Sequence, residues 1–219
     1  MKSRPYTNVP LTWTPTEHHG KNMKKFKKVI EDKYLVKLGD YEDLYKWSIE
    51  NICEFWAEIW DFLGVIFSKR FNKVVDLHIP MNEFPKWFEG AELNYAENLL
   101  KYRDDRIALL VDGEESDTKT YTFAQMYEET RLYAAAFRKF GLKKGDIVVC
   151  HMSNRKEVVF ATQAVISIGA IWTAALPMLG AQPLVVANLT VDKEYVYWIA
   201  CFAILNKIRE NALVLFRTL

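Results

Sequence analysis

Apolar residues recur along the chain at spacings that alternate between helical and strand-like, and this order predicts the architecture. From Tyr41 to Leu63 they fall three and four positions apart, which places them on one stripe of a helix. We expect Ser48 to cap a second helix within this stretch and Gly64 to end it. A stripe of this kind packs in a core more often than it binds a partner. Its members are Ile49, Ile52, Phe55, Trp56, Ile59, Trp60 and Leu63.

Two capping boxes mark the starts of further helices. Asn94 and Glu97 stand three positions apart, as in a capping box. Helix capping therefore accounts for the run NYAEN at residues 94–98 without any catalytic role. Thr122 and Gln125 repeat the arrangement and open a helix that is predicted to continue through Phe140. Its apolar face comprises Phe123, Met126, Tyr127, Thr130, Tyr133, Ala134 and Phe137, and Gly141 follows as its stop.

Short apolar runs predict strands around these helices. Residues 107–111 and 119–122 indicate a strand and a returning strand across the turn at Asp112-Gly113. Residues 147–149 then indicate a buried strand, followed by a helix over 156–168 and a strand over 170–176. We expect Asn154 to cap this helix and Gly169 to end it. Strand, helix and strand within about thirty residues form a βαβ unit with parallel strands, so the fold class is α/β.

The first forty residues and the overall charge limit the classes of partner that the chain is expected to bind. Residues 1–40 are rich in Pro, Thr and Lys and indicate an irregular arm with one short helix. Four lysines surround Phe26, but Glu31 and Asp32 follow, which favours a solvated helical face over an anion or membrane contact. These lysines are Lys24, Lys25, Lys27 and Lys28. Lys and Arg number 29 against 28 Asp and Glu, so nothing calls for a nucleic-acid or membrane partner.

Cysteine and histidine usage points away from several kinds of chemistry. Cys53, Cys150 and Cys201 are scattered and odd in number, which indicates buried free thiols rather than a disulfide framework or a metal site. The first residues lack the apolar run of a secretory signal, and we expect a cytoplasmic protein. His78 and His151 are the only histidines outside the arm. Without a GxSxG elbow or a metal-spaced pair they do not indicate a hydrolase, and we predict no metal ligand.

Two segments carry a resemblance to a known family: residues 87–100, WFEGAELNYAENLL, and residues 169–182, GAIWTAALPMLGAQ. Between them lie YTFAQM and GLKKGDIVV, in the order found in AMP-forming ligases. The chain thus resembles the short-chain acyl-CoA synthetases of the adenylating superfamily, most closely the acetoacetyl-CoA synthetase branch. The resemblance implies that a helical leader over 41–100 precedes the start of the large adenylating domain over 101–182. A divergent apolar tail over 183–219 follows.

By resemblance, the full-length enzymes activate acetoacetate with ATP and Mg²⁺ to an acyl-adenylate, releasing pyrophosphate, and CoA then displaces AMP. They hold the triphosphate in a Ser/Thr/Gly-rich loop of backbone N–H groups. After Gly145 this chain has only Gly169 and Gly180, neither beside Ser or Thr in a run. We therefore expect an amino-terminal part of the large domain that is inactive alone and binds none of ATP, Mg²⁺ and CoA tightly. No catalytic residue carries over.

One loop of the family lies on the CoA side of the active site, and the resemblance places it at Pro177 and Gly180. A loop beyond the carboxyl end of a parallel strand suits a ligand, although an ordinary Pro–Gly turn explains these residues equally well. An alternative function is a non-catalytic short module. It would dock to the full-length ligase through the Trp-rich helix or an open sheet edge.

The family pattern is lost after Gln182. Residues 195–205 are eleven consecutive apolar residues, which is short of the roughly 20 that cross a bilayer, so we expect a buried or interfacial helix. The clean break suggests an alternative transcript end or an incompletely assembled gene. The parallel sheet would be left with an open edge unless the tail covers it, and we predict marginal stability for the chain.

Overall fold

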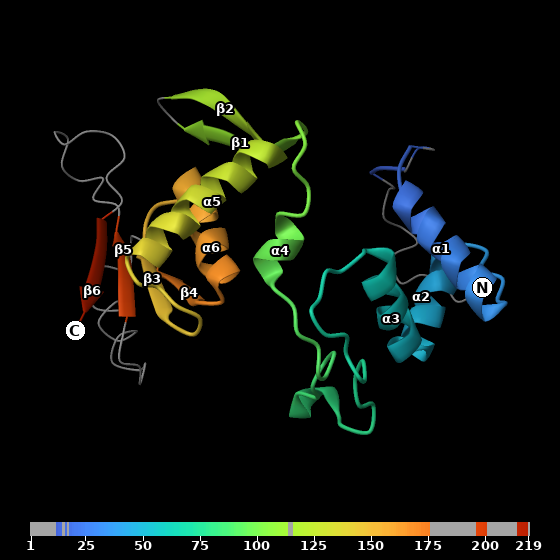
Figure 1. Cartoon of the computed structure of the whole chain (residues 1–219). Helices are drawn as coiled ribbons and strands as arrows, with labels where there is room; N and C mark the ends of the chain where they lie inside the picture. Colours follow the sequence, from blue (N-terminus) through green and yellow to red (C-terminus); the bar gives the residue numbers. More distant parts are fainter. Residues whose placement is uncertain are drawn as a thin grey trace. The chain divides into compact units, whose positions relative to one another are not determined.

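The computed structural model describes residues 12–14, 16, 18–113, 116–175, 196–200 and 214–218, and it gives only the backbone for 116–117 and the last two ranges. The chain divides into two compact units (Figure 1). The first comprises Met1–Val65 and Lys69–Ala91, and the second comprises Ile66–Ser68 and Glu92–Leu219. Each unit is described by itself.

Three α-helices and one short 3₁₀ turn make up the described part of the first unit. They are α1 (Lys21–Tyr34), α2 (Tyr41–Glu50), α3 (Ile52–Phe62) and η1 (Met81–Glu83). The 14-residue α1 is longer than the one short helix expected in the arm, because Phe26 and Ile30 lie one turn apart and both are buried. They join Leu38, Leu44 and Trp47 in one core cluster. Lys24, Lys25 and Lys28 are exposed on α1, in agreement with a solvated face, whereas Lys27 is half-buried and its Nζ donates to Leu38 O at 2.8 Å.

The helical segment predicted over 41–63 contains two helices, as expected, but the second begins after Asn51 and not after Ser48. Ser48 does not cap the second helix as predicted, because its hydroxyl donates to Tyr45 O at 2.7 Å within α2. Asn51 leaves the helical conformation at φ −127°, and both its backbone N–H and its side-chain amide donate to Trp47 O. Gly64 is left-handed at φ +60° after α3, as predicted for a stop.

The break also changes which stripe residues are buried. Trp60 is buried, and Phe55 and Ile59 pack on the α1 cluster, in agreement with the core interpretation. Ile49 and Leu63, however, are 53% and 56% exposed. The stripe is therefore core only in part, since restarting the helix at Asn51 shifts its phase.

The second unit is an α/β fold, as predicted. Its elements are α4 (Tyr95–Leu99), β1 (Ile107–Gly113), β2 (Ser116–Thr122), α5 (Phe123–Lys139), β3 (Ile147–His151), α6 (Lys156–Ile168), β4 (Ile171–Ala175), β5 (Val196–Ala200) and β6 (Val214–Thr218). Strands β1 and β2 form an antiparallel pair. The other strands form one sheet in the order β4-β3-β5-β6. Strand β3 is parallel to both β4 and β5, which confirms the βαβ unit, and β6 is antiparallel to β5.

Local capping explains where the helices of this unit begin and end. Thr122 and Gln125 form the complete predicted capping box of α5: Gln125 N donates to Thr122 Oγ1 at 3.2 Å, and Thr122 N donates to Gln125 Oε1 at 2.9 Å. Gly141 and Gly169 follow α5 and α6 at φ +92° and +81°, as predicted. Asn154 does not cap α6. The N-cap is Arg155, whose extended backbone begins the helix without a side-chain bond.

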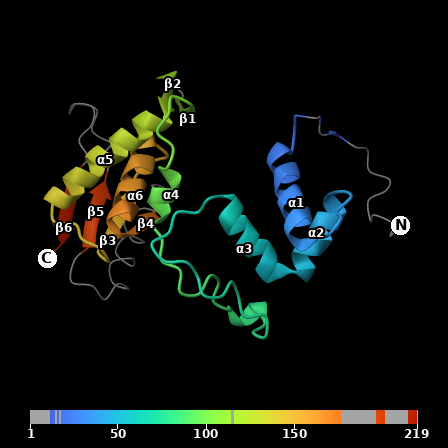
Figure 2. The ribbon, with the colours of Figure 1, turned by 45° about the vertical axis from the view of Figure 1, so that its right-hand side comes forward.

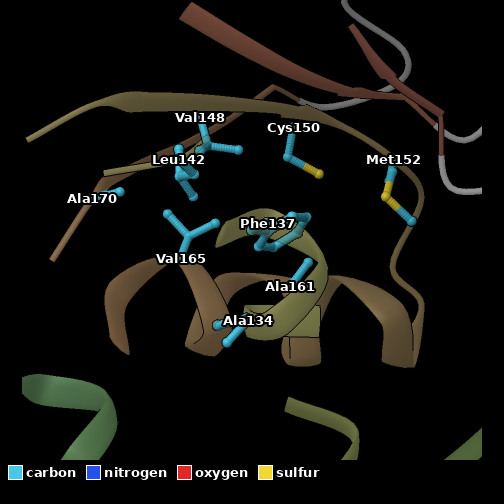
Figure 3. Close-up of a cluster of buried hydrophobic side chains, with 10 residues drawn as sticks. Ala134, Phe137, Leu142, Val148, Cys150, Met152, Ala161, Val165 and Ala170 are labelled. Carbon is cyan, nitrogen blue, oxygen red and sulfur yellow. The ribbon is translucent and has the colours of Figure 1, made fainter. Parts of the chain in front are cut away.

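Helices α5 and α6 cover one face of the sheet, and their apolar sides meet β3 there (Figures 1 and 2). In Figure 3, Val148 and Cys150 point from β3 toward Phe137 of α5 and Val165 of α6. Residues 147–150 of β3 are all buried, as a central parallel strand requires.

The tail forms strands where it is described, so the predicted buried or interfacial helix is wrong for residues 196–200. Its Val-, Tyr-, Trp- and Ile-containing sequence suits a strand, and the free edge of β3 supplies the pairing partner. The tail thereby covers one edge of β3. No helix in the described ranges combines the length and apolar character needed to span a membrane.

Candidate functional site

The carboxyl ends of three parallel strands meet at one edge of the sheet. His151, the last residue of β3, is in register with Ala175 of β4 and Ala200 of β5. Ligands of open α/β sheets bind beyond this edge, so it is the expected position of a substrate. The predicted ligand residues Pro177 and Gly180 follow β4 directly but lie outside the described residues.

His151 places a buried polar atom at this edge. Its Nε2 atom is buried and has no hydrogen-bond partner among the described residues. The sequence predicted a strand or loop histidine rather than a base, and its place at the end of β3 agrees with the strand. His78 lies exposed in a loop, where its backbone N donates to Asp76 Oδ1 at 3.0 Å.

The turn from β3 into α6 carries two cations, Arg155 and Lys156, and the carboxylate of Glu157. The Arg155 guanidinium pairs with the Glu157 carboxylate at 3.1 Å. Burial opposes ionisation of Glu157, but the hydrogen bond from Arg155 prevails and lowers the pKa of that carboxyl. Lys156 lies 5.1 Å from the centre of the Tyr121 ring, and its hydrogen bond to Tyr121 raises the pKa of Lys156. Arg155 and Glu157 therefore neutralise each other at the start of α6, and Lys156 leaves one positive charge there.

Metal and thiol chemistry find little support in the described ranges. No three His, Cys, Asp or Glu side chains gather there as a metal would require, so Mg²⁺ is assigned to no residue. Cys53 and Cys150 are free thiols; Cys150 is buried as expected, whereas Cys53 is only half-buried. Cys150 is buried in the core under β3, which suits packing rather than reactivity.

The LNYAENLL run acts as a structural clamp on α4. Asn94 Oδ1 accepts from Glu97 N at 3.2 Å, which confirms the N-cap, but the described residues show no return bond from the Glu97 side chain, so the predicted capping box is only half formed. Asn94 Nδ2 donates to Ile166 O of α6 at 2.8 Å. Asn98 exchanges two hydrogen bonds with the backbone of Ile66, at 2.8 and 2.9 Å. The residues of this motif therefore have a structural role, as its capping pattern indicated. The long-range partners left no signal in the sequence.

Beside this clamp lies a hollow of about 520 Å³ that the sequence did not predict. Its walls come from α4, α5, the end of α6 and the segment after α4, and they include Lys101, Arg103 and Tyr127. All of its lining residues belong to the second unit.

Comparison with known proteins decides the family. A family model described as the acetyl-coenzyme A synthetase N-terminus matches residues 41–99, and one described as AMP-binding enzyme matches residues 96–189. The acetoacetyl-CoA synthetase of Macaca fascicularis is 42% identical over 173 residues, which are 78% of this chain. The chain belongs to the acetoacetyl-CoA synthetase family. It corresponds to the amino-terminal part of these synthetases, and the matched residues span 26% of the macaque protein.

Other relatives agree on the family and the fold. The solved acetoacetyl-CoA synthetase from Streptomyces lividans aligns with a TM-score of 0.68 and 27% identity, over 79% of this chain and 27% of that one. The malonamoyl-CoA synthetase of Penicillium aethiopicum is 32% identical over 176 residues, covering 78% of this chain and 24% of its own. The synthetase family thus includes relatives named for different acyl groups.

Proposed function

We propose that this chain supplies the leader and the first βαβ unit of an acetoacetate–CoA ligase. The observation that carries the proposal is the 42% identity to an acetoacetyl-CoA synthetase over 173 residues. In the proposed reaction, the acetoacetate carboxylate attacks the α-phosphorus of ATP and pyrophosphate leaves. The CoA thiol then attacks the acyl carbon and AMP leaves.

The described residues would position substrate rather than react with it. His151 is in register with Ala175 and Ala200, which supports a ligand position beyond the carboxyl ends of these strands. Pro177 and Gly180 belong to the segment that follows β4 in the sequence. We assign this loop to the CoA side and place no catalytic group in the 219 residues. The Ser/Thr/Gly-rich phosphate loop is not among them, so these residues alone are proposed to be inactive. The free thiols of Cys53 and Cys150 suit the cytoplasmic setting proposed for this lipid and ketone-body chemistry.

The proposed activity is tested on the protein isolated from its source organism. An antibody against residues 87–100 precipitates it from an extract of the source organism, and the precipitate is assayed for ATP–pyrophosphate exchange. We expect exchange that depends on acetoacetate and is much weaker with acetate. Exchange that depends on another acid, or no exchange from a precipitate that contains the protein, would refute the proposed activity.

A second candidate function is a non-catalytic module that docks to the full-length ligase. Two observations favour it. Trp56 and Trp87 are 40% and 41% exposed in the first unit, with their ring centroids 5.9 Å apart. Strand β4 is an edge strand of the described sheet and carries no charged residue. A blot band near 25.6 kDa that co-purifies with the ligase would support this function. A single band far above that mass would exclude it.

A further inference from the structure

Two buried polar atoms of the neighbouring helices α5 and α6 have no hydrogen-bond partner in the described part of the chain. The helices lie side by side over the sheet (Figures 1 and 2). Thr130 of α5 is 2% exposed and Gln163 of α6 is 7% exposed. Thr130 Oγ1 and Gln163 Oε1 are the unpaired atoms. Burial takes water away from a polar atom, so leaving it unpaired costs the whole free energy of its desolvation.

The two side chains lie in the same seam between the helices. Gln163 Nε2 donates to Met126 Sδ of α5 at 3.9 Å, so the Gln163 amide reaches across to α5. Thr130 follows Met126 by four positions and therefore lies one turn further along the same face of that helix. Met126, Thr130 and Ala134 are buried at successive turns of this face. The Gln163 amide and the Thr130 hydroxyl are thus brought to within about one helical turn of each other.

The surroundings of this pair offer it little else to bond. Thr162 of α6 donates its hydroxyl back to Val158 O at 2.6 Å, as a helical threonine commonly does, but Thr130 makes no bond of this kind. Buried apolar residues flank the pair along both helices, and an ion would find no countercharge among them. These residues are Met126, Ala134, Phe160, Ala161 and Ala164. The complementary partner is a small neutral molecule that both donates and accepts hydrogen bonds.

We propose that one ordered water molecule binds between α5 and α6, where it accepts a hydrogen bond from the Thr130 hydroxyl and donates one to Gln163 Oε1. Buried waters bind where they satisfy polar groups that the fold leaves unpaired. Tyr127 and Ser167 lie one turn from Thr130 and Gln163 along their helices, and both line the hollow beside α4. This hollow gives the water its route to solvent.

Thermal melts of Thr130→Val test the site, because a bound water and a dry seam predict shifts of opposite sign. The variant loses the bond to the water and leaves that water with a weaker hold, so we expect its melting temperature to fall by about 2–4 °C. In a dry seam, a methyl group of the same size would replace an unpaired hydroxyl, and the melting temperature would rise. A rise would therefore overturn the proposal.

A double variant tests whether one molecule joins the two side chains. Thr130→Val combined with Gln163→Leu removes both bonding atoms, so its melting temperature should fall by less than the sum of the two single shifts. Thr162→Val is the matched control, since the Thr162 hydroxyl bonds within its own helix, and its shift should add to that of Gln163→Leu. Additive shifts for Thr130 and Gln163 would contradict a shared water.

A crystal structure of the unaltered chain gives a second readout that does not depend on the folding of any variant. We expect electron density for a water within hydrogen-bond distance of both Thr130 Oγ1 and Gln163 Oε1. A direct hydrogen bond between the two side chains would overturn the proposal, as would a seam filled by apolar side chains alone.

Discussion

Glu58 is a buried carboxylate that joins α3 to α1 in the first unit. It is only 5% exposed on α3, and its carboxylate accepts hydrogen bonds from Lys33 Nζ and, at 3.0 Å, from Tyr34 OH, both on α1. Glu58→Ala removes both bonds. We expect it to lower the free energy of unfolding by about 1–3 kcal/mol, because Lys33 regains water while the Tyr34 hydroxyl loses its partner.

Urea denaturation followed by tryptophan fluorescence measures this change. Glu54→Ala is the matched control, since Glu54 is an exposed acid on the same helix. Equal effects of the two substitutions would show that the buried carboxylate contributes no more than an exposed one.

Tyr34 makes the same contact sensitive to pH. Burial, and then the hydrogen bond to Glu58, raise its pKa from 10.0 to about 12. Since the unfolded chain ionises first, the stabilisation is complete below pH 10 and is lost as the pH rises through about 12. The difference in unfolding free energy between the unaltered chain and Tyr34→Phe should therefore fall across this window. Parallel pH profiles would rule out this role for Tyr34.

At the scale of elements, two glycines with left-handed backbones allow the cost of backbone strain to be compared with the cost of steric crowding. Gly64 after α3 and Gly169 after α6 have φ values of +60° and +81°. A Cβ at Gly64 would meet nothing within 4 Å, whereas one at Gly169 would lie 3.1 Å from Lys144 Cγ. We expect Gly64→Ala to cost about 1–2 kcal/mol and Gly169→Ala to cost more, because only the second is also crowded. Thermal melts of both variants measure the difference, and a cheaper Gly169→Ala would contradict it.

The elements that the sequence predicted well are those whose cause is local. Two examples are the capping box of Thr122 and Gln125 and the helix end at Gly169. Both depend on residues within one helical turn, so they could be predicted from the sequence. The break at Asn51 is subtler, since Ser and Asn are equally good N-cap residues and Ser48 bonds backward to Tyr45 O. Capping propensity alone could not choose between them.

Long-range pairing accounts for what the sequence did not predict. The apolar run after residue 195 shows no periodicity that would distinguish a helix from a strand. It forms a strand at residues 196–200 because the free edge of β3 provides a pairing partner. The hollow beside α4 likewise depends on Asn98 reaching Ile66, 32 positions away. Pro177 and Gly180 remain a prediction.

At the scale of the whole molecule, β3 is the strand on which the sheet depends. It is paired on both sides, by β4 and by β5. A chain that stops after Ala175 loses β5 and β6 and opens one edge of β3 to other molecules. We expect this shortened chain to self-associate and its β3 amides to exchange faster. Light scattering and hydrogen exchange measure both effects, and a monomer with unchanged β3 protection would show that the tail does not cover this edge.

The central claim is that these residues are equivalent to the front of an acetoacetyl-CoA synthetase. A chimera tests it most directly: residues 41–175 replace the matching segment of the Mus musculus synthetase, which is 41% identical to this chain over 173 residues. Circular dichroism and gel filtration first establish that the chimera folds, and ATP–pyrophosphate exchange is then measured with acetoacetate and with acetate. The account predicts exchange that depends on acetoacetate and exceeds that with acetate. A folded chimera without such exchange would contradict the claim.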